Sequence, residues 1–371
     1  MIGSAGITSA LLVTQALAAR IQTFQHQTSQ CSKCPVTHSI LPRMLRLVSQ
    51  QDRRLLPFLT ACLFIITSSV GAQSPRAAAS ASASSEGAVD RGHFSLHYRI
   101  FGTGGPLIIV LAGGPGGDPS YMKPIVERLS TRGRCLLLEQ RGTGRSKLAA
   151  YTEQTINFQS YLDDLEALRK HLNQQNLLLL GHSWGGMLAL SYAGTYPDRV
   201  SAVISIDAGP IAEEHAIAEE ANALRRIDAR EQAHLEELEK RKSADPVGVF
   251  ADMQRATIGA YFYDVRKVSD AATWLTGDSN LEVMRLGYEP AFGSLNSFIR
   301  ERLRSIKAPV LLVHGRQDAV AEGGVFEAHH LIRRSRLVLI DKCGHVPWIE
   351  QPDQLWKAVE SFLSTSQIPA K

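Results

Sequence analysis

Short apolar runs recur along the later three-quarters of the chain, and polar or charged segments separate them. Such runs are typical of strands that a parallel sheet buries on both faces. The stretch from Phe94 to Ile100 instead alternates apolar and polar residues, as a half-buried strand does. The buried strands are expected at residues 107–111, 135–138, 177–180, 200–206, 310–313 and 337–340.

Helical periodicity fills the intervals between these runs. Tyr161, Leu162, Leu165, Leu168 and Leu172 recur at roughly helical spacing, and charged residues occupy the other positions. Strands that alternate with such helices predict an α/β protein with a doubly wound, mostly parallel sheet. In that architecture ligands bind beyond the carboxyl ends of the strands.

The strand pattern stops between residues 210 and 304, where the chain becomes charged and helical. Because this insertion lies between two strands of the sheet, we interpret it as a helical cap over the active edge. It divides the α/β core into a first part, 93–209, and a second part, 305–371.

Residues 1–72 have the features of a leader. Arg53 and Arg54 precede an apolar stretch that ends at Val70-Gly71-Ala72, which predicts cleavage before Gln73 and an exported, periplasmic or extracellular protein. Met44 is a plausible true start. An uncleaved anchor remains an alternative, as does lipidation at Cys62, and either would be the chain's only membrane attachment. Residues 73–92 are poor in aromatic and β-branched residues, so we predict a disordered linker.

The net charge of +4 belongs to the leader. Residues 1–72 contain six Lys and Arg and one Asp, which leaves 34 basic and 35 acidic residues in the remainder. The mature part therefore gives no basis for nucleic-acid binding. Its cysteines show no disulfide framework, and the sequence implies neither a metal nor a cofactor.

The segment LLLLGHSWGG, residues 177–186, predicts a nucleophile elbow at Ser183. A serine hydroxyl attacks well when a strand reverses sharply into a helix and exposes it beside a base. Gly181 and Gly185 leave room for that turn. The motif G-x-S-x-G is common by chance, but here a strand precedes it and a helix of small residues follows it.

A serine nucleophile needs a base and an orienting acid, and two later strands supply them. Asp318 follows the 310–313 strand and His345 follows the 337–340 strand, so the order is Ser, Asp, His. Asp207, at the end of the strand after the nucleophile, is an alternative acid. Four other histidines are interpreted as structural: His182, His314, His329 and His330.

An oxyanion hole needs two backbone N–H groups directed at the developing charge. Trp184, the residue after the nucleophile, is expected to supply one. The glycine-rich loop 112–117 is expected to supply the other, with Gly114 as first choice and Gly113 as second. This loop lacks the Lys-Ser/Thr of a phosphate-binding loop.

Three motifs together resemble the proline iminopeptidase family of α/β-hydrolases: Gly-Gly-Pro-Gly at 113–116, Gln-Arg-Gly-Thr-Gly-Arg-Ser at 140–146, and Gly-His-Ser-Trp-Gly-Gly at 181–186. The resemblance extends over about residues 93–365. It implies a serine hydrolase that releases an N-terminal residue, often proline, from peptides. In that family, cap glutamates bind the ammonium group of the substrate. The residues available here are Glu213, Glu214, Glu219 and Glu220, with Tyr263 and Trp274 as aromatic residues that could line the pocket.

The sequence departs from the family pattern at three positions. Ala112 replaces the usual His, Glu139 replaces the usual Asp, and His182 makes the elbow begin Gly-His, a form common among esterases. A carboxylesterase or another small-molecule hydrolase therefore remains an alternative to an aminopeptidase. A ligand-binding protein on the same fold is a further alternative, although a pure binder has no need of the complete catalytic set.

Overall fold

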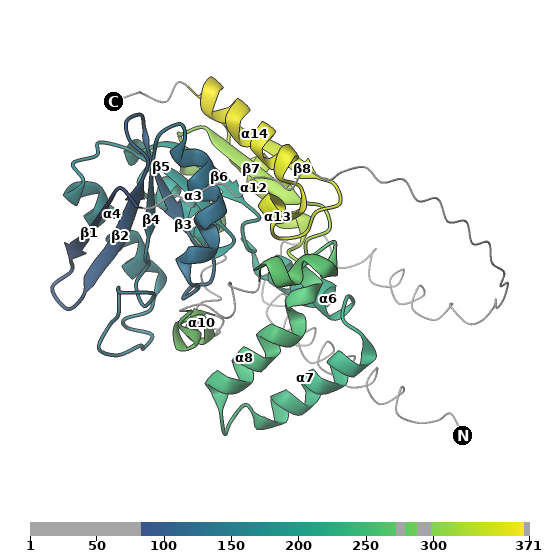
Figure 1. The fold of residues 1–371 in the computed structure, drawn as a ribbon. Helices are drawn as coiled ribbons and strands as arrows, with labels where there is room; N and C mark the ends of the chain where they lie inside the picture. Colours follow the sequence, from purple (N-terminus) through teal and green to yellow (C-terminus); the bar gives the residue numbers. More distant parts are fainter. Residues whose placement is uncertain (1–82, 272–278, 288–297, 367–371) are drawn as a thin grey trace, which may run out of the picture. The chain divides into compact units, whose positions relative to one another are not determined.

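The computed structural model describes residues 83–271, 279–287 and 298–366. The predicted leader, its cleavage site and Trp274 lie outside these ranges. Eight strands form one sheet in the order β1-β2-β4-β3-β5-β6-β7-β8 (Figure 1). The β1–β2 and β2–β4 pairs are antiparallel and all other pairs are parallel, so the predicted doubly wound, mostly parallel sheet is confirmed. The strands span Ser85–Asp90, Ser95–Phe101, Leu107–Leu111, Arg134–Leu138, Leu177–His182, Val200–Ile206, Val310–Gly315 and Ser335–Ile340.

Helices cover both faces of this sheet, and the alternation of side chains along each strand decides which face each residue supports. In β3, Ile109 and Leu111 pack in one hydrophobic cluster with α4 and α5. Ile108 and Val110 pack in the other cluster with α3 and α14. The flanking helices are α3 (Lys123–Ser130), α4 (Phe158–His171), α5 (Trp184–Thr195), α12 (Glu322–Leu331), α13 (Pro347–Glu350) and α14 (Pro352–Thr365).

The first strand corrects the prediction of a disordered linker over residues 73–92. Residues 85–90 form β1, which pairs with β2 along its whole length at the edge of the sheet. An edge strand needs only one side of its backbone paired and few apolar side chains, and Val89 is its only buried residue. Gly87 lies under the ring of Tyr98, where a Cβ would come within 2.3 Å of the Tyr98 hydroxyl. The small residues that suggested disorder therefore fit close backbone pairing.

The predicted cap insertion contains helices α6 (Glu213–Leu224), α7 (Ala229–Arg241), α8 (Pro246–Thr257) and α10 (Leu281–Gly287). Figure 1 shows α6, α7 and α8 gathered on one side of the sheet. Two side chains attach the cap to the loop after β7: the Asn222 amide donates to the Ala319 carbonyl oxygen at 3.1 Å, and the Arg226 guanidinium donates to the Asp318 carbonyl oxygen at 3.1 Å. Among the residues described, no helix is both long enough and apolar enough to cross a membrane.

Candidate active site

Ser183 occupies a strained turn between β5 and α5. Its φ of 54° and ψ of −122° lie in a region that L-residues rarely adopt. Two close contacts enforce the turn, because a Cβ at Gly181 would lie 2.0 Å from the Gly185 carbonyl oxygen and one at Gly185 would lie 2.2 Å from the Leu111 oxygen. The Ser183 carbonyl oxygen accepts hydrogen bonds from the Gly186 and Met187 N–H groups at the start of α5. This is the geometry expected of a nucleophile elbow.

Asp318 and His345 lie in contact beyond the ends of β7 and β8. The His345 Nδ1 is 2.6 Å from the Asp318 Oδ2, and both side chains are buried. Because an ionised carboxylate only accepts hydrogen bonds, Nδ1 carries the proton and Nε2 is the unprotonated nitrogen of the neutral ring. Burial lowers the pKa of His345 to about 3, so the imidazole is neutral near pH 7. A neutral imidazole in this tautomer can take a proton from a hydroxyl group.

Cap and core together fix the loop that carries His345. The His345 N–H donates to the Tyr261 carbonyl oxygen at 2.8 Å. The buried Glu350 carboxylate accepts the Gly344 N–H at 2.6 Å through Oε2 and the Asp264 N–H at 2.8 Å through Oε1. The sequence analysis missed Glu350, because no motif includes it and only the folded chain brings it between the cap and this loop.

His182 links three loops of the site. Its Nε2 donates to the His345 carbonyl oxygen at 2.8 Å, and its Nδ1 accepts from the Tyr121 hydroxyl at 2.8 Å. That hydroxyl in turn accepts the Gly113 N–H. Burial lowers the pKa of His182 well below its usual value, so the ring stays neutral. The interpretation of His182 as structural fits its buried place, but its bridging contacts and the role of Tyr121 were not foreseen.

These contacts also rank the two glycines proposed for the oxyanion hole. Gly113 is close to the elbow, since a Cβ added to it would lie 3.1 Å from the Ser183 Cβ, but its N–H is already bonded to Tyr121. The structure therefore argues against Gly113 as a donor to substrate. Gly114 has a φ of 126°, and a Cβ there would lie 2.6 Å from the Gly117 nitrogen, so only glycine fits.

The loop 139–146 supports this arrangement from the core. The Gln140 amide donates to the Ala112 carbonyl oxygen at 2.8 Å and accepts from the Trp184 indole at 3.1 Å, so one side chain joins the glycine-rich loop to the elbow. Glu139, one of the departures from the family pattern, accepts the Arg145 N–H at 2.7 Å within the same loop. Its carboxylate thus stabilises the 139–146 loop, and its contacts are with that loop and the neighbouring strand β2 rather than with the candidate catalytic residues.

The cap brings one of the four proposed glutamates to the site. The Glu219 Oε1 accepts from the Tyr261 hydroxyl at 2.9 Å, and the Tyr261 ring centroid lies 5.5 Å from that of His345. Burial raises the pKa of Glu219 to about 7, with a smaller raising contribution from the charge of Asp318 and a lowering one from the Tyr261 hydrogen bond. The other three carboxylates are exposed: Glu213, Glu214 and Glu220.

Neither of the two aromatic residues predicted to line the pocket, Tyr263 and Trp274, is placed there by the described structure. Tyr263 is 50% exposed, so the structure favours its neighbour Tyr261 as the tyrosine that contacts the site. Tyr261 is the last residue of a short 3-10 helix, Ile258–Tyr261, and Tyr263 lies beyond its end, so the two side chains need not share a face. Trp274 lies outside the described residues.

Two groups of side chains have donor atoms close enough to hold a metal ion among the residues described. Asp207, His314 and Asp318 are buried together, and Glu214, His215 and Glu327 lie at the surface. In the first group, however, Asp318 already bonds His345, and Asp207 Oδ1 accepts the Gly315 N–H at 2.7 Å. In the second, Glu214 and Glu327 both pair with Arg300. Hydrogen bonds and ion pairs thus already engage each of these carboxyl groups, Asp207 through Oδ1 alone.

Comparisons with known proteins agree with this geometry. A family model for the alpha/beta hydrolase fold matches residues 106–233. Proline iminopeptidase of Lactobacillus helveticus is 25% identical over 287 residues, which cover 73% of this chain and 94% of that protein. The AB hydrolase superfamily protein YclE of Bacillus subtilis is 26% identical over 278 residues, covering 73% and 95%. The crystal structure of proline iminopeptidase from Mycobacterium smegmatis superposes with a TM-score of 0.60 at 20% identity, covering 76% of this chain and 98% of that one.

The fold and these similarities define a hydrolytic enzyme of the α/β-hydrolase fold. Within that class the chain is similar to proline iminopeptidases, in agreement with the resemblance seen in the three motifs.

Proposed function

We propose that this protein is a serine aminopeptidase that removes an N-terminal residue, with proline as the first candidate, from short peptides. The observation that carries the proposal is the place of Glu219, a partly buried cap carboxylate linked through Tyr261 to the His345 loop. A carboxylate there provides a counter-ion for the free ammonium group of a substrate whose first carbonyl lies at Ser183. An ester substrate would have no use for it.

In the proposed reaction His345 Nε2 takes the Ser183 Oγ proton as the oxygen attacks the carbonyl carbon. Asp318 holds the imidazole in the required tautomer and stabilises its charge. The N–H groups of Trp184 and Gly114 stabilise the tetrahedral oxyanion. As the C–N bond breaks, His345 returns the proton to the leaving amine. Water then hydrolyses the acyl-enzyme by the same route in reverse, so the reaction needs no cofactor.

The test compares three substrates on the same enzyme: a prolyl arylamide with a free N-terminus, the N-acetylated form of that arylamide, and a short acyl ester. We expect a large preference for the free amine. Equal turnover of the free and acetylated arylamides, or fast ester hydrolysis alone, would instead identify a general esterase on this scaffold. Binding of all three without turnover would support the ligand-binding alternative.

Export is part of the proposal. Its support is the basic, apolar and small-residue sequence of the leader, which lies outside the described residues. N-terminal sequencing of the protein from separated cell fractions tests it. We expect a mature chain that begins at Gln73 outside the cytoplasm, whereas a chain beginning at a lipid-modified Cys62, or an uncleaved one in the membrane fraction, would indicate an anchored enzyme.

A further inference from the structure

Asp207 is a buried carboxyl group beside the candidate triad. It follows β6 with a φ of 43° and has no exposed surface. Its N–H donates to the Val313 carbonyl oxygen at 2.9 Å, and its Oδ1 accepts the Gly315 N–H at 2.7 Å. Its Oδ2 is also buried, yet it has no hydrogen-bond donor within the part of the chain that the structure describes. A buried polar atom without a partner is costly, so this oxygen requires an explanation.

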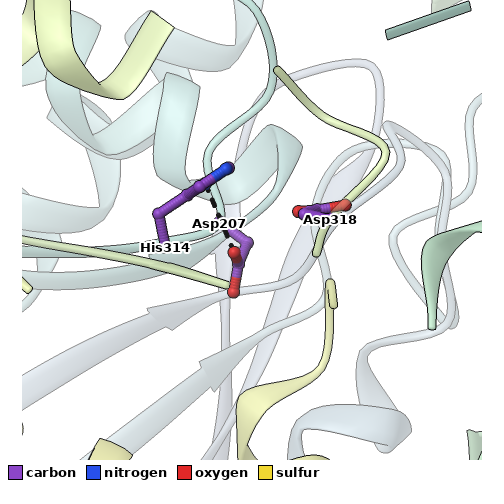
Figure 2. A group of neighbouring side chains, drawn as sticks. All are labelled: Asp207, His314 and Asp318. Atoms are coloured by element: carbon purple, nitrogen blue, oxygen red, sulfur yellow. Dashed lines mark ion pairs between the residues drawn. The ribbon is translucent and has the colours of Figure 1, made fainter. Parts of the chain in front are cut away.

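The neighbours of Asp207 are a second carboxyl group and a neutral ring. Figure 2 shows Asp207 between His314 and Asp318. One carboxyl oxygen of each aspartate and one ring nitrogen of His314 lie within 4.8 Å of one another. The His314 Nδ1 is 3.4 Å from the Asp207 Oδ1. Burial lowers the pKa of His314 to about 4, so His314 brings no positive charge. Two buried carboxyl groups this close, without a cation between them, cannot both be ionised.

The hydrogen bonds decide which carboxyl group keeps the proton. Asp318 accepts from His345 at Oδ2 and from the Val320 N–H at Oδ1, 3.1 Å away, and the Arg226 cation is near. Asp207 accepts one N–H at Oδ1 and nothing from a described donor at Oδ2. Burial raises the pKa of both carboxyl groups, but the Asp318 charge raises that of Asp207 further, whereas the Val320 N–H and Arg226 act to lower that of Asp318. Ionised Asp318 and neutral Asp207 therefore match the donors present.

We propose that Asp207 is a neutral carboxylic acid whose Oδ2 hydroxyl donates a hydrogen bond to the Asp318 carboxylate, which makes it a positioning residue for His345. The assignment of Asp318 as triad acid belongs to the proposed function, and this inference rests on it. The shared proton removes the unpaired oxygen and the repulsion between the carboxyl groups. It also holds Asp318 in the orientation that His345 requires.

Infrared difference spectroscopy tests the proton directly and does not depend on turnover. Glu219 is also partly protonated at neutral pH, so the comparison is made in a Glu219→Gln background. There we expect a protonated carboxyl C=O stretch that adding Asp207→Asn removes. Absence of the band, or its persistence after Asp207→Asn, overturns the inference. If the band belongs to Asp207 but the enzyme prefers no free amine, only the proposed aminopeptidase activity fails.

Kinetics of two variants separate donation from simple packing. Asp207→Asn keeps an N–H donor toward Asp318, so we expect kcat within about threefold of wild type, whereas Asp207→Ala should lose about tenfold or more because the donor is gone. Equal losses in both variants contradict a donor role. If Asp207→Ala does not fold, the kcat of Asp207→Asn and the infrared band still test the donor role of Asp207.

The pH profile provides a second readout. In wild type kcat should fall as Asp207 ionises at alkaline pH and the two carboxylates repel, and Asp207→Asn should lack that limb. Other titratable groups around Asp207 could also cause a fall in kcat at alkaline pH, so each must be distinguished from Asp207. Cys343→Ala, for example, should retain the alkaline limb. Those groups are Asp318, His314, Cys343, His345 and Glu350.

Two rival roles for the same cluster have distinct outcomes. If Asp207 were the triad acid, Asp318→Asn would keep most activity and Asp207→Asn would not. If Asp207, His314 and Asp318 held a metal ion, purified protein would contain one metal equivalent, and a chelator would abolish turnover. Either result overturns the proposal.

Discussion

The carboxyl edge of the sheet and the cap hold their candidate residues in different ways. At the edge, Ser183 and His345 are fixed by backbone hydrogen bonds and by buried side chains that bridge one loop to the next. In the cap, Glu219 is held by one hydrogen bond to Tyr261, and its helix α6 otherwise carries many exposed positions. Under the proposed function, the difference means that the sheet edge supplies the bond-breaking chemistry, while the choice of substrate depends on a few cap contacts.

The largest expected effect comes from removing the nucleophile at the sheet edge. Ser183→Ala should lower kcat by about 10⁶-fold, the order found when a serine-hydrolase nucleophile is deleted. The fold should persist, because the turn depends on backbone contacts of neighbouring glycines. Activity assays and circular dichroism measure the two effects. The matched control is Ser191→Ala in the same helix, which loses only the bond to the Met187 carbonyl oxygen. Full activity in Ser183→Ala would remove the basis of the mechanism.

The next effect belongs to the cap. Glu219→Gln should lower kcat/KM for the free-amine substrate about 30- to 1000-fold, because the ammonium loses its counter-ion. Turnover of the acetylated substrate should change little. Glu220→Gln, an exposed neighbour on the same helix, is the control and should behave as wild type. Equal losses on both substrates would mean that Glu219 supports the fold and does not select the substrate.

The pH dependence of kcat/KM for the free-amine substrate should also report the ionisation of Glu219. The Glu219 pKa of about 7 means that its charge is present at higher pH and is lost as pH falls through 7. We therefore expect kcat/KM for the free-amine substrate to fall about tenfold from its plateau near pH 6. Glu219→Gln should remove this acid limb. An acid limb that survives in Glu219→Gln would belong to another group, His345 included, because the Asp318 carboxylate beside it favours the imidazolium.

The smallest expected effect tests the bridge between loops at the sheet edge. Tyr121→Phe leaves the Gly113 N–H and the His182 Nδ1 without that hydroxyl, which should destabilise the fold by about 1–3 kcal/mol. It should also lower kcat roughly tenfold, less than the loss of an oxyanion donor itself. Tyr192→Phe is the control. It removes a buried hydroxyl that bonds Glu166, so thermal unfolding should shift while kcat stays unchanged.

The sequence could predict those features that depend on local pattern. The strands at 107–111 and 200–206 have the predicted bounds, because short runs rich in apolar and β-branched residues are typical of strands buried on both faces. The positions of Ser183, Asp318 and His345 at strand ends follow from the same pattern. The edge strand β1 was missed because it has one buried residue, Val89, and so carries no apolar pattern.

Contacts between distant segments could not be predicted in this way. Tyr121 and Glu350 have side-chain bonds to residues far along the chain, His182 and Asp264, and no local spacing signals them. Selecting Glu219 from four similar glutamates, and Tyr261 over Tyr263, required knowing which side of the cap faces the sheet.

The Glu350 carboxylate has a consequence for exchanging caps between relatives. One of its oxygens accepts the Asp264 N–H of the cap, and the other accepts the Gly344 N–H of the loop that carries His345. A graft that ends the foreign cap before residue 261 would keep this anchor and the Tyr261 carbonyl that receives the His345 N–H. A graft that ends beyond Asp264 would replace both partners at once. Substrate choice in this scaffold is therefore transferable only in segments that respect that boundary.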